Sequence, residues 1–207
     1  MSDPDFKPVL RPGDAGPAVE SSRECGSCTL CCTLLRVDAL KKLGGVSCAN
    51  LRGTDGGCGI YSDRPKICRT YRCLWLQGGL EEGDRPDRLD AVLDLVSAGG
   101  SVRLAVREVF PGAIDENPRL REIVERYRAG IPVRISNVSD VMNPSAPVRI
   151  LLPGGEEHRL EGDVRTEWRE GQRVRTDKIP FTERAARKIV LAWRRFRLRG
   201  YGDGSAA

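Results

Sequence analysis

The chain has 207 residues, enough for one sizeable domain or two small ones, and 40% of them are hydrophobic, so a core can form. Aromatic residues make up only 5%, which predicts a core built from Val, Leu and Ile. The formal net charge of +5 permits contact with acidic partners but is too small to indicate nucleic-acid binding. No apolar run approaches the length of a membrane span.

The N-terminal stretch is rich in Pro, Gly, Asp and Ser, which predicts a disordered tail over residues 1–22. Acidic residues and prolines stand where a signal peptide would have a basic start and an apolar block. We therefore expect a cytoplasmic protein, and a disulfide framework is not expected in that reducing compartment.

All of the cysteines lie in one stretch of the chain, and the residues after it have none. The eight are Cys25, Cys28, Cys31, Cys32, Cys48, Cys58, Cys68 and Cys73. Cysteines that serve as small core residues would be spread along the sequence, so this clustering indicates metal ligation. We predict a loop-rich metal-binding domain over residues 23–80, with a turn at 53–59 and one short helix over 33–45.

The cysteine spacing indicates more than one pair of ligands. The CxxC at Cys25 and Cys28 lets two thiolates converge on one ion, and Cys31 completes a tripod of the kind that holds one face of a cubane iron–sulfur cluster. Cys31 and Cys32 are adjacent, so they either serve two different sites or include one non-ligand. Eight thiolates divide naturally into two four-cysteine sites. Nine Lys or Arg against four Asp or Glu between Arg23 and Cys73 would stabilise the thiolates.

The absence of histidine near the cysteines limits which metals the segment is expected to bind. The single histidine of the chain, His158, lies far from the cysteines in sequence, so the site is predicted to be all-sulfur. Thiolate ligands suit zinc or an iron–sulfur cluster and argue against copper(II), nickel or non-haem iron. The tripod and the Cys31-Cys32 pair favour an iron–sulfur cluster, and Zn²⁺ stays open as the alternative.

After a polar break at 81–88, residues 88–207 read as a small α+β portion with short antiparallel strands and two main helices. The elements expected in chain order are a hairpin of 91–96 with 102–109, a helix over 117–129, strands at 131–135 and 148–152, a second hairpin of 158–160 with 164–166, and a closing helix over 182–199 capped by Thr182. We expect the cysteine segment to pack on this portion, which gives an α+β fold class.

The closing helix is basic and amphipathic, with seven basic residues and one acid between Thr182 and Arg199. Its apolar residues recur at helical spacing, so one face is expected to be buried; they are Ala186, Ile189, Val190, Trp193 and Phe196. The basic face is most simply a solvated surface whose Arg stems cover the edge of the core. It is also the candidate surface for a protein partner.

The cysteine block resembles a known bacterial family. The stretches CGSCTLCC and GGCGIYSDRPKICRTYRCLWL, read together with Cys48, are similar to the CxxCxxCC cysteine-cluster family, often called the YkgJ family and described as zinc- or iron-chelating. The resemblance covers about 50 residues and includes all eight cysteines. It implies metal binding by these cysteines, and a further similarity to the cysteine-rich part of flagellin lysine N-methylases implies a group-transfer role as one alternative.

Three functions are compatible with the sequence. The first is electron transfer, or support of a redox enzyme, by an iron–sulfur cluster. The second is a structural-zinc module that binds a protein partner, and the third is part of a lysine-methylase-like enzyme. Walker, nucleophile-elbow and dinucleotide motifs are absent from the sequence, so whether the chain is an enzyme is left open.

Overall fold

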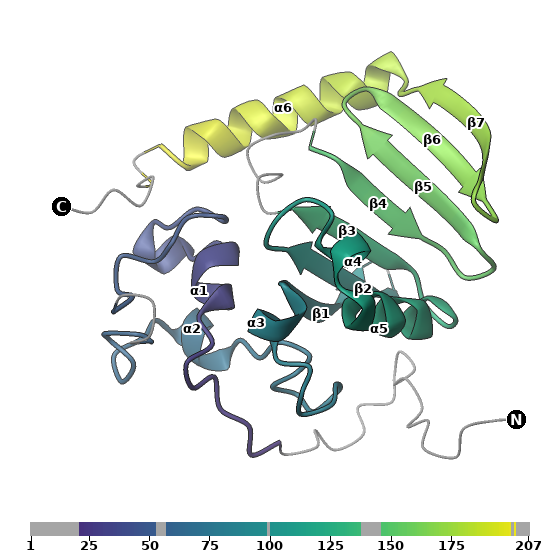
Figure 1. Ribbon diagram of the computed structural model, residues 1–207. Helices are drawn as coiled ribbons and strands as arrows, with labels where there is room; N and C mark the ends of the chain where they lie inside the picture. Colours follow the sequence, from purple (N-terminus) through teal and green to yellow (C-terminus); the bar gives the residue numbers. More distant parts are fainter. Residues whose placement is uncertain (1–20, 53–56, 99, 138–145, 200, 202–207) are drawn as a thin grey trace, which may run out of the picture.

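The computed structural model describes residues 21–52, 57–98, 100–137, 146–199 and 201 (Figure 1). The first twenty residues of the predicted tail, and part of the predicted turn at 53–59, lie outside these described residues. The fold is mixed α+β, as the sequence predicts. Its centre is a sheet of seven strands whose spatial order follows the chain from β1 to β7.

The sheet is larger than the short strands expected from the sequence. Its strands are β1 (Ala91–Ala98), β2 (Ser101–Glu108), β3 (Val133–Asn137), β4 (Val148–Leu151), β5 (Glu156–Glu161), β6 (Val164–Arg169) and β7 (Gln172–Lys178). Neighbouring strands are antiparallel, except that β2 and β3 are parallel. The predicted elements omit β7, because its residues are exposed along almost the whole strand and give no alternation of apolar and polar positions.

The hairpin of β1 and β2 is confirmed and is longer than predicted. It pairs Ala91 with Glu108 at one end and Ala98 with Ser101 at the other. Gly100 has a φ of 80°, a left-handed conformation that favours glycine in a tight hairpin turn. The second predicted hairpin is also confirmed, as β5 and β6.

The parallel pair β2–β3 requires a crossover, which α4 (Ala113–Glu116) and α5 (Pro118–Arg128) provide. The predicted helix over 117–129 corresponds to α5. Asn117 caps it, because its side-chain oxygen accepts hydrogen bonds from the backbone N–H groups of Arg119 and Leu120, both at 3.1 Å. The inner face of α5 packs on β1–β3 to form the main core.

The cysteine segment contains only short helices, which are α1 (Leu30–Leu34), a 3₁₀ turn η1 (Asp38–Leu40) and α2 (Lys66–Thr70). The single helix predicted over 33–45 is therefore wrong. The chain turns extended at Leu35, and a β-bridge joins Val37 to Lys42. The buried Lys42 ammonium donates to three carbonyl oxygens around this turn, those of Thr33, Leu35 and Leu43, which replaces helical hydrogen bonding.

The cysteine segment packs on the face of the sheet opposite α5. Successive residues of a strand point to opposite faces. Leu93 therefore lies in the main core, whereas Val92 packs in a second cluster with Leu34, Cys73, Trp75 and Leu76. The backbone N–H of Leu74 also donates to the carbonyl of Leu93 at 2.9 Å. As expected, the segment and the sheet share a buried interface.

The closing helix, α6 (Phe181–Arg197), begins one residue before Thr182, so that threonine lies inside the first turn and not at the cap. The expected burial of its apolar stripe is wrong. The five predicted core positions Ala186, Ile189, Val190, Trp193 and Phe196 are all exposed, and the helix buries Leu191 instead. Figure 1 shows α6 running along one edge of the molecule, beside the end of the sheet.

A buried ion pair ties the end of the cysteine segment to α5. Asp84, which is 4% exposed, accepts two hydrogen bonds from the Arg119 guanidinium, at 2.8 and 2.9 Å, and one from the backbone N–H of Glu81 at 3.1 Å. Burial alone would raise the pKa of Asp84, but these hydrogen bonds and the Arg119 charge outweigh burial and lower the pKa.

We expect Asp84→Ala to lower the free energy of unfolding by about 2 kcal/mol, because it leaves Arg119 without its main partner. Since the pKa of Asp84 is lower in the folded state, this stabilisation is complete above the unfolded pKa of about 4 and disappears as the pH falls through the folded value. Urea unfolding at pH 7 and at pH 3 would measure both effects. The variant should lose less stability than the wild type between those pH values.

The matched control is Asp87→Ala, which removes a more exposed pair with Arg85 and should cost below about 0.5 kcal/mol. Equal losses of unfolding free energy in Asp84→Ala and Asp87→Ala at pH 7 would contradict the larger contribution assigned to the pair of Asp84 and Arg119.

Candidate metal centre

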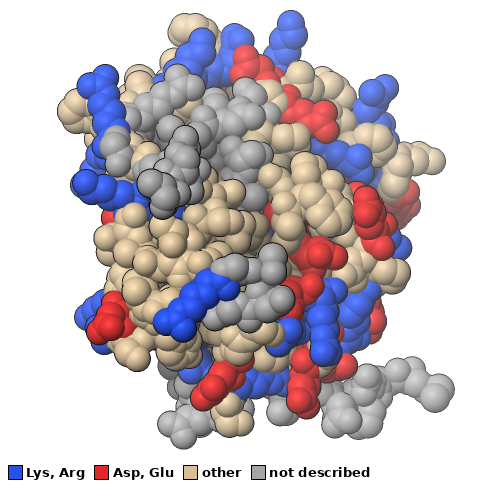
Figure 2. Space-filling model, turned by 60° about the vertical axis from the view of Figure 1, so that its left-hand side comes forward, with Lys and Arg blue, Asp and Glu red and all other residues tan. Residues whose placement is uncertain are grey.

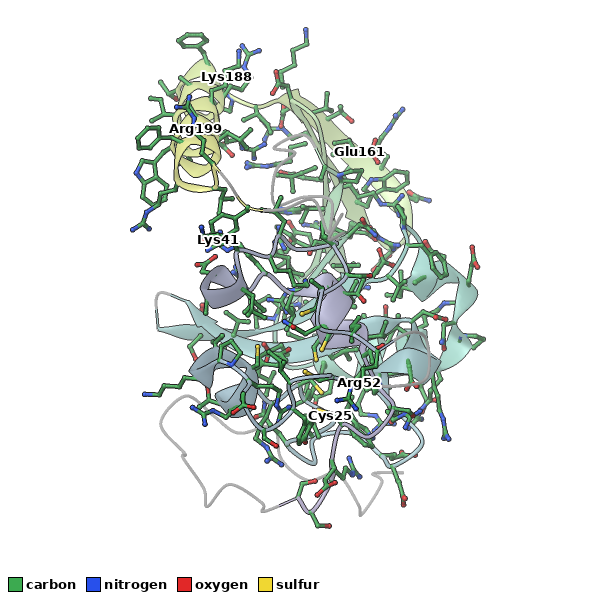
Figure 3. The ribbon with its side chains drawn as sticks, turned by 90° about the vertical axis from the view of Figure 1, so that its left-hand side faces the viewer. Cys25, Lys41, Arg52, Glu161, Lys188 and Arg199 are labelled. Atoms are coloured by element: carbon green, nitrogen blue, oxygen red, sulfur yellow. The ribbon has the colours of Figure 1, made fainter. Side chains whose placement is uncertain are left out.

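All eight predicted ligand residues line one cavity of about 550 Å³ between the cysteine segment and the sheet. Figure 3 shows the sulfur atoms gathered in one region near the labelled Cys25. The walls come from the cysteine segment. The floor is the face of β1–β3 opposite the main core, with Val92, Arg107, Arg134 and Ser136. The structure therefore brings together cysteines that are up to 48 positions apart (73 − 25).

The cysteines are carried on turns and short helices. Cys25 and Cys28 belong to a turn closed by a hydrogen bond from the Cys28 N–H to the Cys25 carbonyl, at 2.9 Å. Gly26 in this turn has a φ of 53°, which a residue with a side chain rarely adopts. Cys31 and Cys32 follow on α1, roughly 100° apart around its axis, so their side chains point in different directions.

The remaining four cysteines come from three further segments. Cys48 lies beside α1, because its backbone N–H donates to the Cys32 carbonyl at 3.1 Å. Cys58 pairs with Leu51 in an isolated β-bridge, and Cys68 lies on α2. Pro65 stands at the N-cap of α2, which begins at the next residue and carries Cys68. Cys73 is the one buried cysteine, and the other seven are half-buried.

All eight thiols are free of disulfide bonds, and the residues that carry them line the cavity. Within the described residues, no group of three or more His, Cys, Asp or Glu side chains is close enough to hold a single metal ion.

The thiols form two overlapping sets that share Cys32. The pKa of Cys31 is raised first by its hydrogen bond to Cys32, and that of Cys25 by burial and then by the charge of Cys32. The pKa of Cys73 is raised by burial and then by Cys25 and Cys28, and these two cysteines also raise the pKa of Cys31. The pKa of Cys68 is raised by burial and then by Cys32, Cys48 and Cys58. We call Cys25, Cys28, Cys31 and Cys73 the first group and Cys32, Cys48, Cys58 and Cys68 the second group.

The two groups meet at the adjacent pair of cysteines on α1. A hydrogen bond from the Cys31 thiol lowers the pKa of Cys32 and raises that of Cys31, and the charges of Lys42 and Arg64 lower the pKa of Cys32 further. Burial is the main cause of the raised pKa values of Cys25 and Cys28. Because a cysteine binds metal as the thiolate, any metal bound here would displace protons and would bind more weakly as the pH falls.

Two cations lie beside the thiols. Lys42 is buried, and burial lowers its pKa, while Cys48, Cys32, Cys31 and Cys68 act in the opposite direction. The Arg64 side chain donates from Nε to the carbonyl of Tyr61 at 2.8 Å and lies over the Tyr61 ring, with its guanidinium carbon 3.5 Å from the ring centroid. Both cations can compensate the negative charge of a thiolate-bound centre.

The aromatic residues of the segment have different roles. Trp75 is buried in the cluster under α1, and Tyr71 is half-buried at the cavity. Tyr61 is half exposed, so it supports Arg64 and does little to shield the thiols from water. Burial raises the pKa of Tyr71, and the charge of Asp94 raises it further.

Sequence reasoning missed several polar residues that line the cavity, among them Lys42, Arg107, Arg134 and Ser136. A signal for the last three existed. In both Val106–Arg107 and Arg134–Ile135–Ser136, polar residues alternate with buried apolar ones, which indicates a polar face opposite the core. Nothing in the sequence distinguishes Lys42, which is buried, from its neighbour Lys41, which is exposed. His158 lies on β5, where it contacts Glu156 at 2.7 Å.

Comparison with family models, curated proteins and solved structures finds no match to this chain. Of the helices in the described part of the chain, none combines the length and the apolar character needed to cross a membrane.

Proposed function

We propose that this protein is a metal-binding protein whose eight cysteines hold iron–sulfur centres, four cysteines to each, and that it serves in electron transfer or supports a redox enzyme. The observation that carries the proposal is the single cavity lined by all eight free thiols, with Lys42 and Arg64 beside them. A thiolate donor set of this kind is typical of iron–sulfur clusters and of zinc. The resemblance to the CxxCxxCC family agrees with the proposal.

The cysteine spacing favours a cluster over single ions, because Cys25, Cys28 and Cys31 form a tripod of the kind that holds one face of a cubane cluster. Zinc in a structural site requires four sulfurs at about 2.3 Å from one point. A cubane cluster is several atoms wide and is held from its corners. The cavity volume of about 550 Å³ gives room for such a centre.

The chain's own residues would hold and tune the centre. The first and second groups supply four thiolates each, and Lys42 and Arg64 stabilise these thiolates electrostatically. When bound, an iron–sulfur cluster supplies a site that accepts and releases one electron. Seven of the eight cysteines are half-buried, which leaves the centre within reach of a partner at the surface.

A redox titration tests this function. We expect the anaerobically purified protein to show a reversible one-electron change in its visible absorption between oxidant and reductant. Zinc has no redox change, so a titration without any spectral change would contradict the electron-transfer role while leaving metal binding intact. Zinc as a structural element of an interaction module is the second candidate, because a donor set made only of thiols suits zinc as well as an iron–sulfur cluster.

A further inference from the structure

The outer side of α6 is an exposed apolar surface. Ile189 is 69% exposed, Phe196 66% and Trp193 55%, and Phe181 and Val190 are exposed as well. The helix has seventeen residues, so this surface extends for about 25 Å at 1.5 Å per residue. Large exposed apolar surfaces on a protein mark sites of contact with another molecule or with a membrane.

The side of α6 turned toward the molecule is defined by its buried residues and ion pairs. Leu191 and Leu198 are buried, and Arg184 and Glu183 form ion pairs with Asp163 at 3.2 Å and Arg165 at 3.6 Å. At roughly 100° per residue, Ile189 lies about 160° to 180° around the axis from both leucines. The apolar surface therefore faces away from the sheet, as the side chains on the outer side of α6 show in Figure 3.

Basic residues border this apolar surface on both sides. Lys188 and Arg197, both exposed, lie on either side of Ile189 at roughly 100° and 80° around the axis. The Arg197 guanidinium lies 4.7 Å from the centroid of the Trp193 ring, and that of Arg199 lies 5.4 Å from the Phe196 ring. Figure 2 shows several Lys and Arg side chains along the top of the molecule, where α6 lies in Figure 1.

We propose that α6 is an interfacial helix that docks this protein on the surface of an anionic phospholipid bilayer. Helices that lie in a membrane interface carry Trp, Phe and aliphatic side chains on one face, bordered by Lys and Arg that contact the headgroups. The helix lies on the bilayer and does not cross it. The inference is independent of the metal centre, because none of the residues involved lines the cysteine cavity.

The charge of α6 argues against the other occupants. Two copies of α6 packed face to face would bring the Lys188 and Arg197 borders of both helices together, and like charges repel. A nucleic acid would attract the arginines, but its phosphates would offer nothing to Ile189 and Val190, the aliphatic part of the outer surface. A bilayer provides both an anionic surface and an apolar interior.

The test is co-sedimentation of the full-length protein with vesicles of phosphatidylcholine alone or with about one third phosphatidylglycerol. We expect binding to the anionic vesicles to be at least about tenfold tighter, to weaken in high salt, and to fall at least about tenfold in the double variant Trp193→Glu/Phe196→Glu. The matched control is Val174→Glu, which changes an exposed apolar residue on β7 and should bind as the wild type does. A blue shift of tryptophan emission on the vesicles, lost in Trp193→Phe, would place Trp193 in the bilayer.

Three results would overturn the proposal. The first is equal, negligible binding to both kinds of vesicle. The second is a wild-type dimer in analytical ultracentrifugation that the double variant dissociates, which would assign the face to a second copy of the chain. The third is Trp193 protected from acrylamide quenching in the free monomer, which would mean that another part of the chain covers the face. Circular dichroism of each variant would establish that it is folded before binding is compared.

Discussion

Removal of the bound metal is expected to unfold residues 23–80 and to leave the sheet folded. In the described part of the segment no helix is longer than five residues, and its buried cluster is small compared with the core between α5 and β1–β3. Metal ligation would therefore supply most of its folding free energy, and structural zinc in small domains supplies about 10 to 16 kcal/mol. Hydrogen exchange of the protein with and without a chelator would measure the effect residue by residue.

The expected exchange pattern has an internal control. Backbone amides of α1 and α2 should lose protection after chelation, whereas those of β2 and α5 should keep it. The raised thiol pKa values of Cys25, Cys28 and Cys68 predict the same loss of protection as the pH falls, since protons then compete with the metal for the thiolates. Unchanged protection of the segment after complete metal removal would contradict a structural role for the metal.

Substitution of one cysteine from each group is expected to remove one of two metal centres. Cys28→Ser should abolish the centre of the first group, and Cys68→Ser should abolish that of the second, so each variant should retain about half of the metal. Both residues are half-buried, so the substitutions do not open a hole in the main core. Elemental analysis of the purified variants, together with the double variant, measures the outcome.

The control for this pair is Ser27→Ala, which changes an exposed residue between two cysteines without removing a thiol and should leave the metal content unchanged. Complete loss of metal in either single variant would contradict two separate groups and indicate one centre that needs all the thiols. Full metal content in Cys28→Ser would instead exclude Cys28 as a ligand.

The sequence predicted best where local chemistry determines structure. The helix expected over 117–129 and the hairpin of 91–96 with 102–109 follow from local residue patterns, and the structure has both as α5 and as the pair β1–β2. The eight candidate ligands were also predictable, because clustered cysteines need no knowledge of the fold. Their gathering around one cavity follows from how the loops pack on the sheet, and short-range patterns do not contain that information.

The errors have a common physical origin. The helix expected over 33–45 is ended by a bridge to Lys42 and by the hydrogen bonds of its ammonium, which are tertiary contacts. The apolar periodicity of the α6 segment predicted a helix, but it did not predict which face of the helix is buried. A buried face and an exposed interaction face have the same 3.6-residue repeat. Only the placement of Leu191 on the inner side shows which face α6 turns outward.

The central claim, that the eight cysteines hold a metal centre, is tested most directly by anaerobic purification followed by elemental analysis and a visible spectrum of the same sample. We predict a brown protein with broad thiolate-to-iron absorption near about 400 nm and matching iron and acid-labile sulfide. Colourless protein with about two zinc ions would keep the metal centre and exclude the redox function. Folded protein without stoichiometric metal would contradict the central claim.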